Sequence, residues 1–216
     1  MLGCRRLATV ARMTVMGRKL PRKFYSRTDT VQIARELLGK LLVVPDDRGN
    51  RVSGMIVETE AYLGHEDRGA HSYGGRRTAR NEVMYGLAGH VYVFFVYGMY
   101  YQFNVVTGPL DHPHAILVRG VEPVEGVEIM RERRGSKARR DRDLTSGPGK
   151  LAIAMGIDRS LNGTDLVDDR CWLENYRLFA DDEIASGPRI GIDYAGEDAL
   201  KPWRFWVTAN EFVSKR

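Results

Sequence analysis

The chain has 216 residues, of which 43% are hydrophobic and 28% charged, which is typical of a globular domain with a single core. Its longest apolar run, residues 91–97, is far shorter than the roughly 18 residues of a membrane-spanning helix, so we expect no membrane partner. The two cysteines, Cys4 and Cys171, exclude a disulfide scaffold or a cysteine metal cluster and predict free thiols in a reducing compartment. A net charge of +5 favours a polyanionic partner without requiring one.

Residues 1–22 are basic and contain no acidic side chain. An amphipathic targeting segment and an extension from an upstream start codon both fit this composition. A secretory signal does not, because arginines interrupt the apolar part. We expect a disordered basic extension over residues 1–22, one domain over residues 23–216, and an intracellular protein that is not secreted. No coiled coil is visible in the sequence, which favours a monomer.

The first half of the domain reads as a helix followed by a hairpin. Thr28 or Asp29 can cap a helix over residues 29–38, which Gly39 can end. The apolar run 40–44 predicts a strand, the polar run 46–50 predicts a turn, and residues 52–62 predict the returning strand.

A glycine-rich and charged segment over residues 64–89 predicts a long irregular loop, which in a compact domain is usually functional. Aromatic and β-branched residues then predict a hairpin over residues 90–106. Shorter elements follow: a strand at 115–118, helices at 124–134 and 147–155 with Ser146 as a candidate cap, and strands at 189–192 and 204–208. Together these predict one α+β domain around antiparallel strands.

Two carboxylates in the strand over residues 52–62 are unusual. Period-two alternation places Glu58, Glu60 and Tyr62 on one face, with the two carboxylates ~7 Å apart. If this face is buried, each carboxylate disfavours ionisation of the other, which can tune one of them as a general base near neutral pH. The alternative is a solvent-facing strand with two ordinary glutamates.

The hairpin turn carries large aromatic residues where small polar ones are usual, beginning with Tyr97. On a nucleic-acid binder such a tip acts as a wedge between bases. The alternative is that the tip packs beneath another loop. A metal site built from Glu58, Glu60, His71, His112 and His114 is a weaker hypothesis, because the spacing matches no known signature.

Considered together, these stretches resemble the alkyladenine (3-methyladenine or methylpurine) DNA glycosylase family over residues 23–214. The matching residues include Ile56-Val57-Glu58-Thr59-Glu60-Ala61-Tyr62-Leu63-Gly64, Ala70-His71-Ser72, Gly74-Gly75-Arg76, Arg80-Asn81, Tyr97-Gly98-Met99-Tyr100, Asn104, Arg119, Glu122-Pro123, Ser146-Gly147-Pro148 and Ala195-Gly196. The run 56–64 followed by 97–100 is the most specific part of this match.

The resemblance implies one mixed α+β domain with a curved antiparallel sheet, flanking helices, and a β-hairpin that inserts into DNA. It implies double-stranded DNA with damaged purines as the partner, and no metal or cofactor. Glu60 matches the general base. Arg119, and with it the carbonyl of Val207, matches the group that holds the attacking water. Residues matching the base pocket are Tyr62, His71, Phe94 and Asn104.

Tyr97 matches the tyrosine that fills the gap left by the flipped base, and Asn104 the asparagine that helps exclude the guanine amino group. We expect phosphate contacts from Arg76, Arg77, Arg80 and Lys150, with the basic run 131–142 as a further candidate. Phe94 departs from the family, where a tyrosine is usual, so the ring is kept and a hydroxyl is lost. The chain between Asn104 and Arg119 is also slightly longer.

These residues imply a base excision repair enzyme that flips alkylated or deaminated purines and hydrolyses the N-glycosidic bond to leave an abasic site. No lysine lies in the matching motifs, which predicts no Schiff base and no strand cleavage. A non-catalytic nucleic-acid binder and a metal-dependent hydrolase are the competing hypotheses. Glu60 argues against the first, because a carboxylate in a DNA groove repels phosphate.

Overall fold

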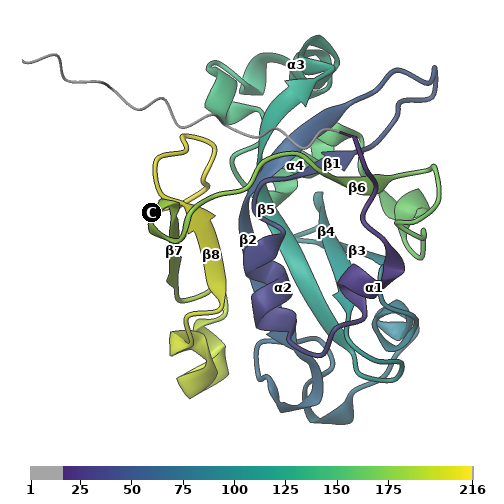
Figure 1. Cartoon of the computed structure of the whole chain (residues 1–216), viewed down its shortest axis with the longest axis vertical. Coiled ribbons are helices and arrows are strands. Elements are labelled where there is room, and N and C mark those ends of the chain that lie inside the picture. Colours follow the sequence, from purple (N-terminus) through teal and green to yellow (C-terminus); the bar gives the residue numbers. More distant parts are fainter. Residues whose placement is uncertain (1–16, 216) are drawn as a thin grey trace, which may run out of the picture.

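The computed structural model describes residues 17–215, which form a mixed α+β domain (Figure 1). Its helices are α1 (Arg22–Tyr25), α2 (Thr30–Glu36), α3 (Val127–Arg134) and α4 (Pro148–Met155). Its strands are β1 (Lys40–Val43), β2 (Ser53–Leu63), β3 (Val91–Val96), β4 (Tyr100–Thr107), β5 (His114–Glu125), β6 (Trp172–Asn175), β7 (Ile184–Gly187) and β8 (Arg204–Val207).

All strand pairs of the described chain are antiparallel and belong to one sheet with the order β3-β4-β5-β2-β1-β6. Strand β2 is its organising element. It pairs with β5 along its length, with β1 at its start, and with β8 at Glu58–Glu60. Strand β7 extends the sheet beyond β8. The α+β class predicted from the sequence is confirmed.

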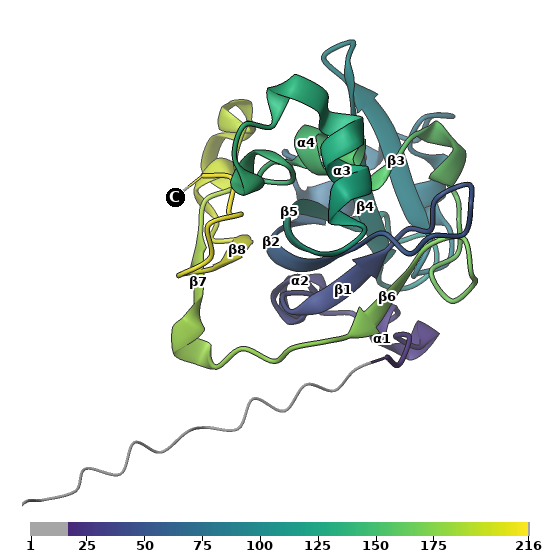
Figure 2. The same ribbon diagram turned by 90° about the horizontal axis from the view of Figure 1, so that it is seen from above.

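Helices cover both faces of the centre of the sheet. Figure 2 shows α2 on one side of β2 and β5, with α3 and α4 on the other. Ile33 and Ala34 of α2 and Leu151 and Met155 of α4 are fully buried in the same core. The hydroxyl of Thr59 donates to the carbonyl of Ala34 at 2.8 Å, so Thr59 faces α2 and its neighbours in β2 face the other side.

Local sequence explains the elements that were predicted well. The side chain of Asp29 accepts a hydrogen bond from the amide of Gln32 at 2.9 Å and so caps α2. Asp46 accepts from the amides of Arg48 and Asn50, which closes the turn between β1 and β2. The hairpin of β3 and β4 was also predicted within one or two residues.

Other expectations were wrong. Strand β5 runs to Glu125 rather than ending at residue 118, because its polar half is paired with β2. Residues 189–192 form no strand, and β7 lies just before them at Ile184–Gly187. Ser146 does not cap α4, whose N-cap is Gly147 with no side-chain cap bond.

The packed domain also begins before residue 23. Leu20 is buried, and its amide donates to the carbonyl of Leu173 at 2.8 Å. Residues 1–16, including Cys4, lie outside the described residues. Cys171 is a free thiol, and burial raises its pKa to about 12, so it is unreactive at neutral pH. Within residues 17–215 no helix is both long and apolar enough to cross a membrane.

Substitution of Gly39, between α2 and β1, can test how tightly the chain is packed at this connection. Its φ is +82°, and a Cβ there would overlap the carbonyl oxygen of Arg177. We expect Gly39→Ala to lower the free energy of unfolding by about 2–3 kcal/mol or more. Gly49 has a φ of +79° with open space around it, so Gly49→Ala should cost only ~1 kcal/mol of backbone strain. Urea denaturation of both variants measures the difference; equal losses would contradict the packing argument.

Candidate functional site

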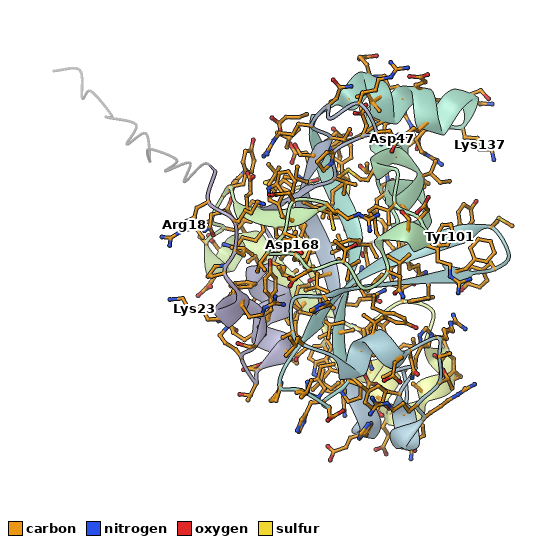
Figure 3. All side chains as sticks on the ribbon, turned by 90° about the vertical axis from the view of Figure 1, so that its right-hand side faces the viewer. Arg18, Lys23, Asp47, Tyr101, Lys137 and Asp168 are labelled. Carbon is orange, nitrogen blue, oxygen red and sulfur yellow. The ribbon has the colours of Figure 1, made fainter. Side chains whose placement is uncertain are left out.

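A cavity of about 350 Å³ opens between the β3–β4 hairpin, the middle of β5 and the segment 190–194. Figure 3 shows the hairpin, with Tyr101 labelled, projecting on the side of the molecule away from Arg18 and Lys23. The lining residues are mostly aromatic and apolar, with a few polar groups: Tyr62, His71, Tyr92, Phe94, Tyr97, Gln102, Asn104, Leu117, Arg119, Ile190, Ile192 and Tyr194 are among them. Such composition is typical of a ligand pocket.

Glu60 lies beneath the wall of this cavity. Its side chain is fully buried on the face of β2 opposite α2. Oε1 accepts a hydrogen bond from the amide of Ile190 at 2.7 Å and pairs with the guanidinium of Arg119 at 3.3 Å. Oε2 accepts from the hydroxyl of Tyr62 at 2.8 Å. All three partners line the cavity, and a carboxylate has about four acceptor sites, so one remains for a further donor.

Glu58 is equally buried and lies on the same face, so the solvent-exposed alternative for this strand is wrong. Its Oε1 accepts from Arg119 at 3.1 Å and from Arg204 at 3.0 Å. Its Oε2 accepts from the amide of Ser214 at 2.6 Å. The two carboxylates are therefore matched by two guanidinium groups, two backbone amides and a tyrosine hydroxyl.

Arg119 joins the two carboxylates. Burial opposes its charged form, but Glu60 and Glu58 outweigh burial and raise its pKa above the ordinary value. Arg119 is thus a permanent cation at the back of the cavity. A buried cation in this place holds Glu60 in one orientation and keeps a positive charge close to any negatively charged or polar ligand atom.

Tyr62 lies between Glu60 and a second buried ion pair. Arg189 stacks on the Tyr62 ring at 4.7 Å and pairs with Asp67 at 2.5 Å. Arg189 also donates to the carbonyl of Ala61 at 2.9 Å. Burial, followed by the charge of Glu60, raises the pKa of Tyr62 well above its ordinary value, so its hydroxyl remains a donor to Glu60.

The base of the hairpin supplies a four-residue patch on one wall of the cavity. Tyr92 pairs with Asn104, and Phe94 with Gln102, in the register of β3 and β4. Because side chains alternate along a strand, the four side chains share one face, and all four line the cavity. The Tyr92 and Phe94 rings are 5.2 Å apart.

His71 contacts this patch from the loop over residues 64–89. Its Nδ1 lies 2.9 Å from the Tyr92 hydroxyl, and its ring meets Phe94 edge-on at 4.5 Å. Burial, followed by the charges of Arg80 and Arg76, lowers the pKa of His71 to about 4. The imidazole is therefore neutral at physiological pH, and His71 acts as a flat ring rather than a cation.

The hairpin tip is exposed, so the alternative that it packs beneath another loop is wrong. Tyr97 is 78% exposed and Met99 61% exposed, and Tyr97 has a positive φ of 54°. Tyr97 lines the mouth of the cavity together with Tyr194. A large ring held at this position stands beside the opening rather than inside it.

The four basic side chains predicted to contact phosphates differ in how strongly other groups of the protein engage them. Arg76 is exposed, and Arg80 lies over the Phe94 ring at 5.2 Å while it donates to the carbonyl of Phe95. Arg77 is engaged by Glu82 and Asp111 and stacks on Tyr85 at 4.4 Å. Lys150, on α4, is partly exposed.

The basic run 131–142 is partly neutralised within the protein. Arg131 pairs with Asp141 at 2.6 Å, and Arg140 with Asp143 at 3.3 Å. Lys137 of this run lies on the side toward which the hairpin projects (Figure 3). The run therefore presents less free charge than its sequence suggests.

Val207 is not brought to the cavity. It lies in β8, is buried opposite Ile184, and its carbonyl accepts from the amide of Asn210 at 3.3 Å. The backbone group that meets Glu60 is instead the amide of Ile190. The role expected of the Val207 carbonyl stays a prediction, and in this structure that carbonyl is engaged by a turn.

The histidines proposed for a metal site do not meet the two glutamates. His71 contacts Tyr92, and the Nδ1 of His114 lies 3.0 Å from the Thr30 hydroxyl on the α2 side. Across residues 17–215, no three histidine, cysteine or acidic side chains are grouped so that they could hold a metal ion.

Sequence reasoning missed several residues of the site: Arg204, Asp67, Arg189, Ile190 and Gln102. The signals were weak. Arg204 and Arg189 resembled ordinary strand cations, although two buried glutamates require more than one compensating cation. Gln102 lies two residues before Asn104 on the same strand, and alternation alone would have placed it on the same face.

Comparison with known proteins gives a consistent result. A family model described as methylpurine-DNA glycosylase (MPG) matches residues 23–211. A relative from Clostridium acetobutylicum is 49% identical over 202 residues, which cover 91% of this chain and 97% of the relative. Relatives from Desulfitobacterium hafniense and Methanocella arvoryzae are 48% and 49% identical, over 91% of this chain and 98% and 96% of their own lengths. All three carry the provisional name 3-methyladenine DNA glycosylase.

The family model covers most of the chain, and the relatives align over nearly their whole lengths. The chain therefore belongs to the methylpurine-DNA glycosylase family and is a DNA glycosylase that removes alkylated purines from DNA in base excision repair.

Proposed function

We propose that the cavity receives a purine flipped out of duplex DNA and that Glu60 activates the water that releases it. The observation that carries this proposal is the position of Glu60. It is a fully buried carboxylate whose three partners, Tyr62, Arg119 and Ile190, all line an aromatic cavity. A base in the duplex is inaccessible to such a group, so the enzyme must extrude it at a cost of a few kcal/mol.

The reaction needs a nucleophile at C1′ of the deoxyribose. Water bound at the remaining acceptor site of Glu60 forms a bond from its oxygen to C1′ while the bond from C1′ to the purine nitrogen breaks. The bond's electron pair leaves with the base, and the proton of the water passes to Glu60. The negative charge of Glu60 also stabilises the cationic sugar of the transition state, and Arg119 fixes the carboxylate in place.

The product of this step is an abasic site in an intact strand. Strand cleavage by a Schiff base requires an amine at the reacting carbon. No lysine is among the cavity-lining residues of the described chain. We therefore assign a monofunctional glycosylase without lyase activity.

Aromatic rings around the cavity favour electron-poor purines. Tyr62, His71 and Phe94 offer flat surfaces, and stacking contributes ~1–3 kcal/mol per base with little dependence on sequence. An alkylated, cationic base gains a further cation–π contribution. The neutral state of His71 matters here, because an imidazolium would repel such a base.

The exposed Tyr97 is suited to fill the gap that the flipped base leaves. Arg76, Arg80 and Lys150 form no ion pair among residues 17–215 and are the cations that we assign to phosphate contacts, whereas Arg77 must first leave Glu82 and Asp111. In the pocket, Asn104 is assigned to exclude the amino group of guanine. Its side-chain nitrogen donates to the carbonyl of Tyr92 at 3.1 Å, which fixes the orientation of the amide.

The first test replaces Glu60. Glu60→Gln keeps the shape of the side chain and removes the base, so we expect the rate of 3-methyladenine release to fall about 10²–10⁴-fold while binding to the lesion is retained. Release is measured from methylated duplex DNA in the presence of a strong chelator. Glu128→Gln on the exposed face of α3 is the matched control and should release the base at the wild-type rate.

The state of the DNA strand completes this test. Strands should remain intact until alkali is added, as an abasic product requires. Lesion binding without release by either protein would replace the assigned chemistry with a damage-binding role. Release that stops in chelator would favour a metal-dependent hydrolase.

The wedge is tested by Tyr97→Ala. Loss of a ring that stacks in the gap should reduce single-turnover release roughly 5- to 150-fold, which corresponds to ~1–3 kcal/mol of stacking. Leu178→Ala is the matched control, because Leu178 is 72% exposed and lies between β6 and β7, outside the cavity lining. Equal effects of the two substitutions would remove Tyr97 from the mechanism.

The neutral state of His71 is testable by NMR titration of its ring protons. Burial and nearby cations disfavour the protonated ring, so lowering the pH from 7 to 5 should leave His71 neutral, with a midpoint of about 4. Arg80→Gln removes one of these cations and should raise the midpoint, whereas Arg140→Gln at the distant basic run should not. A midpoint near 6.5 in the wild-type protein would contradict the assignment.

A further inference from the structure

The hairpin patch contains a polar side chain to which the base-release reaction assigns no role. Gln102 pairs with Phe94 and lies two residues from Asn104 on the same face of β4. Its side chain lines the cavity and is partly buried. An amide in an otherwise aromatic wall is costly to desolvate unless a ligand satisfies it.

The two amides of this patch are in different states. The side-chain nitrogen of Asn104 is engaged by the backbone carbonyls of Tyr92 at 3.1 Å and Gln102 at 3.4 Å. Among residues 17–215, by contrast, no protein group hydrogen-bonds the side-chain amide of Gln102. Gln102 therefore keeps both a donor and an acceptor available to whatever enters the cavity.

From this geometry we propose that Gln102 is a specificity-determining residue that hydrogen-bonds the edge of the flipped purine. The proposal rests on the assignment of the cavity as the base pocket. A primary amide is complementary to a base edge that has one donor beside one acceptor, and glutamine pairs with adenine in this way. The amide oxygen accepts from the 6-amino group, and the amide nitrogen donates to the adjacent ring nitrogen.

This chemistry separates damaged purines into two classes. In 3-methyladenine the 6-amino group and a neighbouring ring nitrogen remain open. In hypoxanthine the 6-oxygen and the N1 proton form the reversed pair, which the amide matches by rotation. In 1,N6-ethenoadenine the added ring occupies both N1 and N6, so no such pair remains. Gln102 thus favours open-edge purines over blocked ones of similar size and stacking area.

The proposal is tested with Gln102→Met, which keeps the length of the side chain and removes the amide. Release of 3-methyladenine from methylated DNA and of hypoxanthine from a defined duplex should fall roughly 5- to 150-fold, the range of one bidentate base contact. Release of ethenoadenine should change less than about threefold. Where the wild-type enzyme releases a lesion too slowly to time, duplex affinity in the Glu60→Gln protein replaces the rate.

Gln32→Met, on α2 across the sheet, is the matched control and should leave all three substrates unchanged. A selective loss for the open-edge purines supports the role of Gln102. Equal losses for all three lesions would show a structural role only, and unchanged rates would show that the amide contacts no base. Failure of the proposed function would be recognised by a different result, because Glu60→Gln would then release bases at the wild-type rate.

Discussion

Two carboxylates from one strand lie in the interior of this protein, and much of the architecture is arranged to hold them there. An unpaired buried carboxylate costs several kcal/mol, so Glu58 and Glu60 require partners from several neighbouring elements. Arg119 comes from β5, Arg204 from β8, the Ile190 amide from the segment after β7, and the Ser214 amide from the end of the described chain. The long β2 strand, which pairs with β5 on one side and with β1 and β8 on the other, is the only scaffold in the described chain that brings these four contributions together.

The two carboxylates have different surroundings and therefore different uses. Glu58 is held by Arg119, Arg204 and the Ser214 amide, and neither Arg204 nor Ser214 lines the cavity. Glu60 is held only by groups that also form the cavity wall. Glu58 thus fixes Arg119, and Arg119 in turn fixes Glu60, the carboxylate to which the proposed function assigns the water. In the proposed mechanism, charged groups held in advance in this way would need little reorganisation when the sugar becomes cationic.

The sequence was most informative where local rules dominate. Asp29 predicted the start of α2, the Asp46 turn predicted the first hairpin, and alternation placed Glu58 and Glu60 on one face. The sequence was least informative where polar contacts between residues distant in sequence determine the local conformation. The polar second half of β5 did not look like a strand, because the groups that pair with Arg119 and hydrogen-bond Glu122 lie far away in sequence. Residues 189–192 looked like a strand, yet the Ile190 amide donates its hydrogen bond to Glu60 instead of to a neighbouring strand. Resemblance to a family suggested several site residues, and the role that it gives Val207 stays a prediction.

One hairpin carries both the exposed Tyr97 and the patch formed by Tyr92, Phe94, Gln102 and Asn104. Because a strand rises about 3.3 Å per residue, three residues from Phe94 to Tyr97 set a spacing of roughly 10 Å between the patch and the tip. In the proposed function, the hairpin would set the distance between the gap that Tyr97 fills in the DNA and the pocket that holds the extruded base. A single pair of strands fixes that length. Adding or deleting one residue per strand would change the distance between the tip and the patch. It would also turn the patch to the face of the hairpin that points away from the cavity.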